Sequence, residues 1–254
     1  MLFNASPDIL TQIQNCNVLQ PARTLRDSGI ASVVLMDAQV DHTTGLLMLR
    51  ENAQPLKLYC THPVKEDLSV GNPIFKVLEH YCNIDWREIA IGADDLRIHG
   101  AEDVSFQPLA LTSNAPPYSP HRDKPVDGDT IGMFMRDVKT GKSLFYAPGL
   151  GEMEPHVWQC MQAADVVLVD GTMWTDDEMI SRGASQKTAR SMGHLPQSGK
   201  GGMIEWLNKL PDTTRKILIH INNTNPILDE DSHERTLLTE YGIEVAMDNL
   251  EITI

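Results

Sequence analysis

The sequence has few cysteines, and no two of them are spaced as a common metal or redox motif. Only four occur in 254 residues, and none forms a Cys-x-x-Cys pair. This spacing argues against a disulfide framework or an all-cysteine zinc site and favours reduced thiols in a cytoplasmic protein. No apolar run reaches the ~20 residues of a membrane span. The N-terminus is neither basic nor followed by a long apolar run, so we expect no signal peptide.

Basic residues are also scarce. Lys and Arg total 21 against 35 Asp and Glu, which gives a formal net charge of -14. This balance argues against nucleic acid or an anionic membrane as the main partner. With 41% hydrophobic and 22% charged residues, the chain can bury a large core, which argues against intrinsic disorder. We see no internal repeat and no linker, and we expect a single domain over residues 1–254.

Short, apolar, β-branched segments recur along the chain and predict strands buried on both faces. They occupy residues 31–36, 130–135, 143–147, 165–169 and 215–219. Amphipathic helices are predicted at 74–81, 154–163, 201–210 and 233–241, the last ended by Gly242. Strands covered by helices indicate a layered α/β domain. Residues 112–129, rich in Pro, Ser and Asp, form a long predicted loop of the kind that is often functional.

Side chains that can bind metal follow three of the predicted strands. Asp41 and His42 follow the first, Asp170 follows the fourth and His220 follows the fifth. The crevice at such strand ends is the usual ligand site of an α/β sheet. Two carboxylates and two imidazoles suit Fe(II), Zn(II) or Mn(II). Taken alone, each of these residues is more simply explained as a turn former, a helix cap or a packed histidine. Their occurrence together after three strands favours a metal site.

The stretch Asp37-Ala38-Gln39-Val40-Asp41-His42-Thr43-Thr44-Gly45 resembles the metal-binding loop of the metallo-β-lactamase fold, which reads His-x-His-x-Asp-His. Later in the chain, Asp170 matches the bridging Asp of that fold and His220 its last His. The resemblance implies a four-layer αββα sandwich. It therefore agrees with the layered α/β class that the strand pattern predicts.

Further segments resemble the pyrroloquinoline quinone (PQQ) biosynthesis protein B family, so that the resemblance covers essentially the whole chain. The most specific are the Asp-x-Gln-x-Asp-His variant and the run His-Ile-Asn-Asn-Thr-Asn-Pro at 220–226. The other matching segments are 2–9, 19–23, 114–118, 169–179 and 192–196.

The departures from the wider fold concern the number of metal ions. Asp37 and Gln39 stand where a dinuclear member has histidines, and no His falls near residues 108–114. Because Gln is a poor Zn(II) ligand and the histidines are absent, the sequence lacks the ligands of one of the two metal sites. The resemblance therefore implies one divalent metal ion, held by Asp41, His42, Asp170 and His220. Fe(II) is the expected ion, with Zn(II) as an in vitro substitute, and hydrolysis by a two-metal clamp is disfavoured.

The family resemblance implies a role in PQQ biosynthesis, as an iron-dependent oxygenase that hydroxylates the Tyr ring of a small intermediate derived from Glu and Tyr. Two alternatives stay open. The first is a carrier that moves PQQ or its precursor towards the periplasm, and the second is a dinuclear metal hydrolase. The expected partners are the small substrate and other PQQ biosynthesis proteins, and the oligomeric state is open, with a homodimer as one option.

The supporting residues have two interpretations each. His194, in Gly-His-Leu-Pro, resembles a substrate-side His that acts as acid or base, and a turn His is an equal alternative. Asp37 and Gln39 are interpreted as partners that orient ligating imidazoles, with Asp37 as an alternative ligand. The Asn residues of 222–225 are expected chiefly to satisfy loop backbone groups.

The start of the chain carries a further expectation. The resemblance implies a segment before Leu2 that holds the first strands of the sheet and a cysteine cluster similar to a structural zinc site. This sequence has neither, so we expect an N-terminally shortened member with an exposed strand edge. Such a chain should be less stable than a version extended upstream.

Overall fold

The computed structural model describes residues 1–20 and 25–254 and separates into two compact units. Unit 1 comprises residues 1–110 and 115–131, and unit 2 comprises residues 111–114 and 132–254. Residues 21–23 of the family-like segment 19–23 lie outside the described residues. A single domain over 1–254 remains a prediction.

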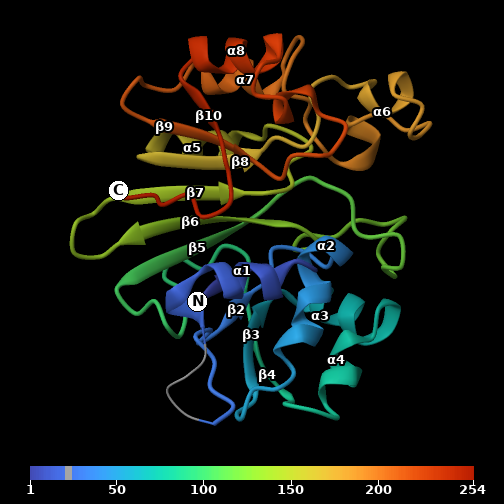
Figure 1. The fold of residues 1–254 in the computed structure, drawn as a ribbon, viewed down its shortest axis with the longest axis vertical. Helices are drawn as coiled ribbons and strands as arrows, with labels where there is room; N and C mark the ends of the chain where they lie inside the picture. The colour runs from blue at the N-terminus through green and yellow to red at the C-terminus, as the bar shows by residue number, and fades with distance from the viewer. Residues whose placement is uncertain (21–24) are drawn as a thin grey trace. The chain divides into compact units, whose positions relative to one another are not determined.

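Unit 1 contains a parallel sheet of four strands in the order β1-β2-β3-β4, drawn in blue to teal in Figure 1. Its strands are β1 (Leu2–Phe3), β2 (Val33–Val34), β3 (Leu56–Cys60) and β4 (Ile84–Glu88), with β5 (Val104–Ala110) following in the chain. Its helical segments are α1 (Ile9–Asn15), η1 (Asn17–Leu19), α2 (Val40–Thr43), η2 (Thr44–Leu49), α3 (His62–Glu66), η3 (Asp67–Gly71) and α4 (Ile74–Leu78).

The core of unit 1 forms where the apolar faces of these helices meet the sheet. Leu56 and Leu58 of β3 are almost fully buried, as are Ile74 and Leu78 of α4. Ile74 and Leu78 are four residues apart and therefore share one face of the helix. The sequence predicts a helix over 74–81, and α4 confirms its start but ends at Leu78.

Unit 2 contains neighbouring strands in the order β10-β9-β8-β7-β6. The β6–β7 pair is antiparallel and the other pairs are parallel. Its strands are β6 (Ile131–Asp137), β7 (Ser143–Ala147), β8 (Val166–Asp170), β9 (Arg215–Ile219) and β10 (Ile243–Val245). Its helical segments are α5 (Pro155–Ala163), α6 (Glu178–Ser181), η4 (Arg190–Met192), α7 (Met203–Leu207), η5 (Pro226–Leu228) and α8 (His233–Glu240).

Local sequence explains most of unit 2. The β-branched run of β8 suits a strand whose flanks are both paired. Pro155 begins α5, where its missing N–H removes no helical hydrogen bond. The Ser232 side chain accepts a hydrogen bond from the Arg235 backbone N–H at the start of α8, and Gly242 follows its end with φ 64°. α5 packs against β7, and α8 packs against β10 (Figure 1).

Two further segments are shorter than predicted, and a third agrees with its prediction. The strand predicted over 31–36 is reduced to the two residues of β2, because the chain then turns towards α2. The helix predicted over 201–210 is reduced to α7. Residues 112–129 form no helix or strand, which confirms the predicted loop.

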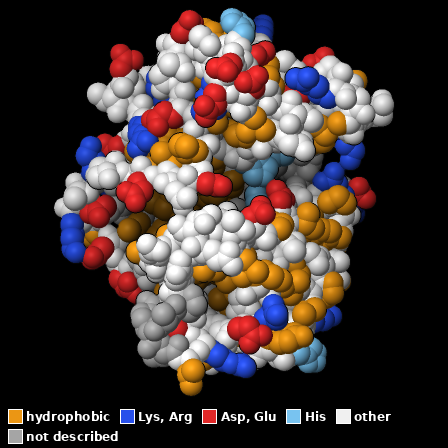
Figure 2. Space-filling view, viewed as in Figure 1, with side chains coloured by type: hydrophobic (Ala, Val, Ile, Leu, Met, Phe, Trp, Pro, Cys, Tyr) orange, Lys and Arg blue, Asp and Glu red, His pale blue; other side chains and the backbone are white. Residues whose placement is uncertain are grey.

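Acidic side chains are scattered over the surface with basic ones among them (Figure 2). Among the described residues, no helix has both the length and the apolar character that a bilayer crossing requires.

Candidate metal centre

In unit 1, the segment between β2 and α2 places an aspartate against a histidine. Asp37 is 3% exposed, and its Oδ1 accepts a hydrogen bond from the Gln39 backbone N–H at 2.9 Å. The same oxygen lies 2.7 Å from His42 Nδ1. Because an ionised carboxylate only accepts hydrogen bonds, His42 Nδ1 carries the proton of this contact. The lone pair of the neutral ring is then on Nε2, the nitrogen that can bind a metal.

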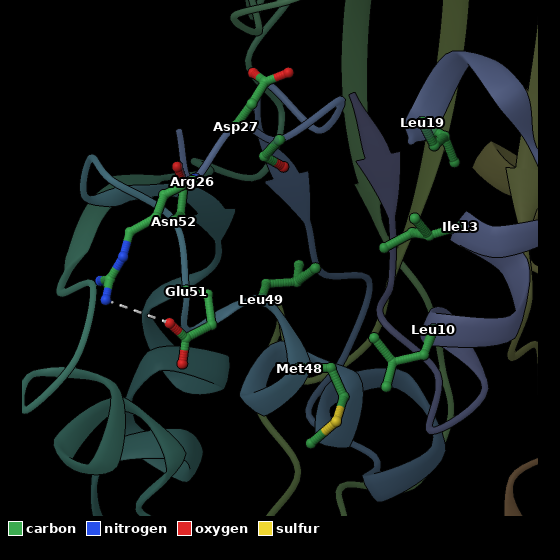
Figure 3. A pocket seen from close by; sticks show the side chains of 10 residues that line it. Leu10, Ile13, Leu19, Arg26, Asp27, Met48, Leu49, Glu51 and Asn52 are labelled. Atoms are coloured by element: carbon green, nitrogen blue, oxygen red, sulfur yellow. Dashed lines mark ion pairs between the residues drawn. The ribbon is translucent and has the colours of Figure 1, made fainter. Parts of the chain in front are cut away.

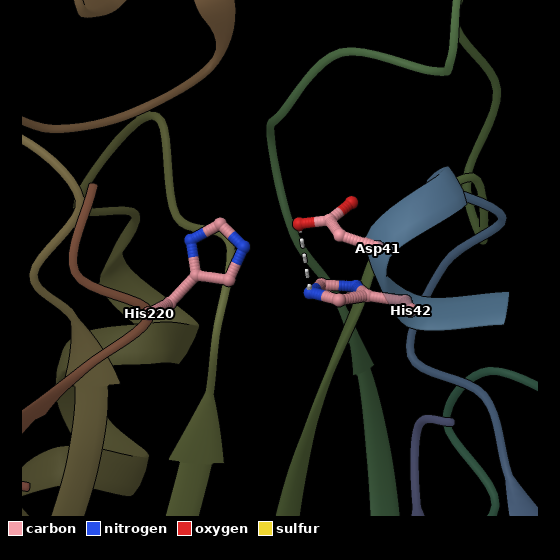
Figure 4. A group of neighbouring side chains, drawn as sticks. All are labelled: Asp41, His42 and His220. Carbon is pink, nitrogen blue, oxygen red and sulfur yellow. Dashed lines mark ion pairs between the residues drawn. The ribbon is translucent and has the colours of Figure 1, made fainter. Parts of the chain in front are cut away.

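Asp41 precedes His42 on α2 and is far more exposed, with 56% of its side chain accessible. One of its carboxylate oxygens lies 3.9 Å from His42 Nε2 (Figure 4). Two ligands of one tetrahedral zinc-type ion stand roughly 3.3 Å apart, given metal–ligand bonds of about 2.0–2.1 Å. The Asp41 oxygen and His42 Nε2 could therefore approach a shared ion after a small rearrangement.

The backbone of this segment is held from both sides. The Thr43 hydroxyl donates to the Gln39 carbonyl oxygen at 2.8 Å, and the Tyr118 hydroxyl donates to the Ala38 carbonyl oxygen. Burial raises the pKa of Tyr118, which keeps its hydroxyl protonated as a donor. Gly45 follows α2 at a point where a Cβ atom would meet the Ser6 carbonyl oxygen at 2.1 Å. The closely packed backbone therefore fixes where Asp41 and His42 project.

In unit 2, Asp170 ends β8 and is fully buried. Its Oδ1 accepts from the Thr172 backbone N–H at 2.9 Å and from the Thr172 hydroxyl at 2.5 Å. Its Oδ2 accepts from the Leu150 backbone N–H at 2.9 Å and lies 2.7 Å from His194 Nδ1. Burial by itself raises the pKa of Asp170, but the adjacent His194 and His220 outweigh it and hold that pKa below its ordinary value. Asp170 is therefore a buried carboxylate that stays ionised.

Two histidines stand beside this carboxylate. His194 and His220 stack with ring centroids 5.6 Å apart and planes 22° apart. His220 Nδ1 lies 2.7 Å from the Thr172 hydroxyl oxygen. One nitrogen of each ring and one oxygen of Asp170 lie within 4.8 Å of one another.

The loop after β9 presents His220 in an unusual backbone conformation. His220 has φ 59°, in the left-handed region that non-glycine residues rarely adopt (ring drawn in Figure 4). The flanking chain is fixed by hydrogen bonds from the Gly171 N–H to the Ile219 carbonyl and from the Asn222 N–H to the Thr172 carbonyl. Asn225 donates to the carbonyls of Gly171 and Thr172, which confirms its predicted role in satisfying loop backbone groups. The prediction is not confirmed for Asn222, whose side chain donates to the Thr224 hydroxyl and the Met179 sulfur instead.

The candidate residues of the sequence thus fall into one group in each unit. Asp37 and Asp41 accompany His42 in unit 1, and Asp170 accompanies His194 and His220 in unit 2. Sequence reasoning did not single out Thr172. Thr172 follows the end of β8 by two residues, and a Thr at such a position is an ordinary turn residue.

A cavity of about 430 Å³ lies elsewhere in unit 1 (Figure 3). Its lining is mostly apolar, with Leu10, Ile13 and Met48 on one side and the Arg26–Glu51 ion pair on another. None of the candidate metal ligands lines this cavity, so it is separate from the candidate metal centre.

Comparison with known proteins supplies the family. A model of the β-lactamase superfamily domain matches residues 1–221. The coenzyme PQQ synthesis protein B of Azoarcus sp. (strain BH72) is 65% identical over 255 residues, covering 100% of this chain and 83% of the relative. The chain belongs to the coenzyme PQQ synthesis protein B family. A second member, from Methylococcus capsulatus, is 54% identical, again covering 100% of this chain and 83% of the relative.

Solved structures agree with this family and its fold. Zn(2+)-bound PqqB from Methylobacterium extorquens matches with a TM-score of 0.88 and 32% identity, covering 100% of this chain and 83% of that one. A diphosphatase of the PhnP family matches with a TM-score of 0.64 at 16% identity, covering 100% of this chain and 79% of that one, and shows the fold alone. The predicted metallo-β-lactamase fold and the predicted family are both confirmed.

Proposed function

We propose that this member of the coenzyme PQQ synthesis protein B family acts in PQQ biosynthesis as an oxygenase that uses one Fe(II) ion. Its proposed reaction is hydroxylation of the Tyr ring of a small intermediate derived from Glu and Tyr. The names of the relatives support the pathway, and the Zn(2+)-bound state of the M. extorquens protein supports a divalent metal. Other proteins of the pathway would supply this intermediate.

The donor chemistry of the residues fits such an ion. Of the four predicted ligands, we assign Asp41, His42 and His220 to direct contact with the metal. Two imidazoles and one carboxylate are the donor set of non-haem Fe(II) oxygenases. Bound Fe(II) would supply the O₂ chemistry that no amino-acid side chain supplies. Asp170, the fourth predicted ligand, accepts hydrogen bonds on both oxygens, and we assign it a supporting role instead.

The observation that carries this proposal is the shared anchoring of the histidines through Nδ1. His42 is held by Asp37 and His194 by Asp170, both at 2.7 Å. Anchored in this way, His42 directs Nε2 towards a metal, and His194 can exchange a proton with substrate at Nε2. Asp37 is therefore assigned the orientation of His42, and His194 the acid–base role.

The same contacts disfavour the dinuclear hydrolase. A second ion would need strong ligands at the positions of Asp37 and Gln39. Asp37 is already engaged by His42, and Gln39 offers only an amide.

Iron loading and oxygen uptake test the proposal. The protein loaded anaerobically should retain one Fe(II) per chain and then consume O₂ with the Glu–Tyr-derived substrate. Asp41→Ala and His220→Ala should abolish iron retention, whereas His233→Ala, an exposed histidine at the start of α8, should not. Two tightly bound ions per chain would favour the hydrolase, and binding of the quinone without O₂ uptake would favour the carrier.

A further inference from the structure

Thr172 occupies a position in unit 2 that no sequence motif assigns to the site. It is 6% exposed, and its hydroxyl oxygen lies between two candidate functional groups. Asp170 Oδ1 is 2.5 Å away and His220 Nδ1 is 2.7 Å away. Both contacts are within hydrogen-bond distance, so the hydroxyl joins the buried carboxylate to the imidazole.

The chemistry of the three groups determines where the protons lie. A threonine hydroxyl has one hydrogen to donate, and an ionised carboxylate can only accept. The hydroxyl therefore donates to Asp170, and its oxygen accepts a hydrogen bond from His220 Nδ1–H. In the neutral ring this arrangement puts the lone pair on Nε2. The tautomer of His220 is thus fixed by Thr172.

The four hydrogen bonds to Asp170 limit its own role. A carboxylate offers about four lone-pair positions, and Asp170 accepts from two backbone N–H groups, one hydroxyl and one imidazole. Its 2.7 Å separation from His194 Nδ1 is a hydrogen-bond distance, shorter than the roughly 3.3 Å between two ligands of a tetrahedral zinc-type ion. Metal binding by Asp170 would therefore break an existing contact.

We propose that Thr172 and Asp170 are positioning residues, with Thr172 holding His220 in the Nδ1–H tautomer and Asp170 anchoring both Thr172 and His194 instead of ligating metal. This inference rests on the proposed function in that His220 is a metal ligand. Backbone hydrogen bonds hold Thr172 in place between Asp170 and His220. The Thr172 N–H donates to Asp170, and the Thr172 carbonyl accepts from the Asn222 N–H and the Asn225 side chain.

Two substitutions distinguish the effect of the Thr172 hydroxyl from the effect of its side-chain volume. Thr172→Val removes the hydroxyl at nearly constant shape, and Thr172→Ser keeps it. Thr214→Val is the matched control, because Thr214 is also 6% exposed in unit 2 and its hydroxyl contacts the Ala164 carbonyl instead of an imidazole. All three are compared with the unchanged full chain.

The first measurement is the tautomer of His220 in metal-free, ¹⁵N-labelled protein at pH 8, where imidazoles are largely neutral. Long-range ¹H–¹⁵N correlation distinguishes a protonated Nδ1 from a protonated Nε2, and His220→Asn assigns the signal. We expect Nδ1–H in the unchanged chain, in Thr172→Ser and in Thr214→Val, and a mixture of tautomers in Thr172→Val. Nε2–H in the unchanged chain would overturn the proposal even if Thr172→Val did not fold.

The second measurement is Zn(II) affinity by competition with a chelator. Loss of a partner that orients a ligating imidazole typically weakens metal binding 10–100-fold, and we expect this range for Thr172→Val. Thr172→Ser and Thr214→Val should stay close to the unchanged protein. Equal affinity of Thr172→Val and the unchanged protein would overturn the proposal. If the tautomer and Zn(II) results are as expected but iron-loaded protein consumes no O₂, the oxygenase function fails and the positioning role stands.

Discussion

Asp67, at the start of η3 in unit 1, should destabilise the folded protein at neutral pH. Its side chain is fully buried, and neither carboxylate oxygen accepts a hydrogen bond of normal geometry from the described residues. Burial raises the pKa of Asp67 from 3.8 to about 6; Ser119 and His121 oppose the rise, and the Asp129 carboxylate adds to it. The folded state therefore binds this proton more tightly than the unfolded state.

The sign and size of the effect follow from this difference. Because the pKa of Asp67 is raised on folding, stability falls as pH increases from about 3.8 to about 6 and then levels off. At about 1.4 kcal/mol for each pH unit, the penalty is about 3 kcal/mol at pH 8 and about 0.5 kcal/mol at pH 4. Asp67→Asn removes the charge and should recover this difference.

Urea unfolding at pH 8 and pH 4 measures this pH-dependent penalty. Asp67→Asn should gain about 2–3 kcal/mol more stability relative to the unchanged protein at pH 8 than at pH 4. Asp94→Asn, at an exposed position of the same unit, controls for the general relief of a chain with net charge -14. A gain that is independent of pH, or one matched by Asp94→Asn, would refute the assignment of the penalty to Asp67.

Three further outcomes are expected. Gly45→Ala should lower stability by about 1–3 kcal/mol in urea unfolding, because the new Cβ would stand 2.1 Å from the Ser6 carbonyl oxygen. Cys60, whose thiol pKa is raised to about 12 by burial, should resist alkylation at pH 8 in the native protein and react in urea, as read by mass spectrometry. His220→Gly should unfold at a higher temperature than His220→Ala, since only glycine adopts φ 59° without a cost of about 1 kcal/mol or more.

The strands of unit 2 could be predicted closely because their signal is local. β7 and β9 have the predicted bounds, 143–147 and 215–219, and each contains an unbroken stretch of aliphatic or aromatic residues, Leu-Phe-Tyr-Ala and Ile-Leu-Ile. β3 and β4 were not predicted, because Leu-Lys-Leu-Tyr-Cys and Ile-Asp-Trp-Arg-Glu mix polar residues into short segments. These two strands are stabilised by pairing with each other, and a local sequence preference does not reveal that pairing.

The candidate site divides in the same way. Asp37 and His42 are five residues apart, so both partners of their contact lie within one short sequence motif. The contacts of Asp170 with His194 and of Thr172 with His220 span 24 and 48 residues. Such contacts depend on where separate loops converge, which spacing along one sequence does not determine.

The histidine contacts also indicate what orients the proposed ligands. His42 and its partner Asp37 both belong to unit 1, whereas His194, His220 and their partners Asp170 and Thr172 all belong to unit 2. Each ring is therefore held by side chains of its own unit. Because these contacts already orient the imidazoles, a metal that they bind would lose less binding free energy to ordering them. Loss of an anchor should therefore weaken metal binding even when every ligand is retained.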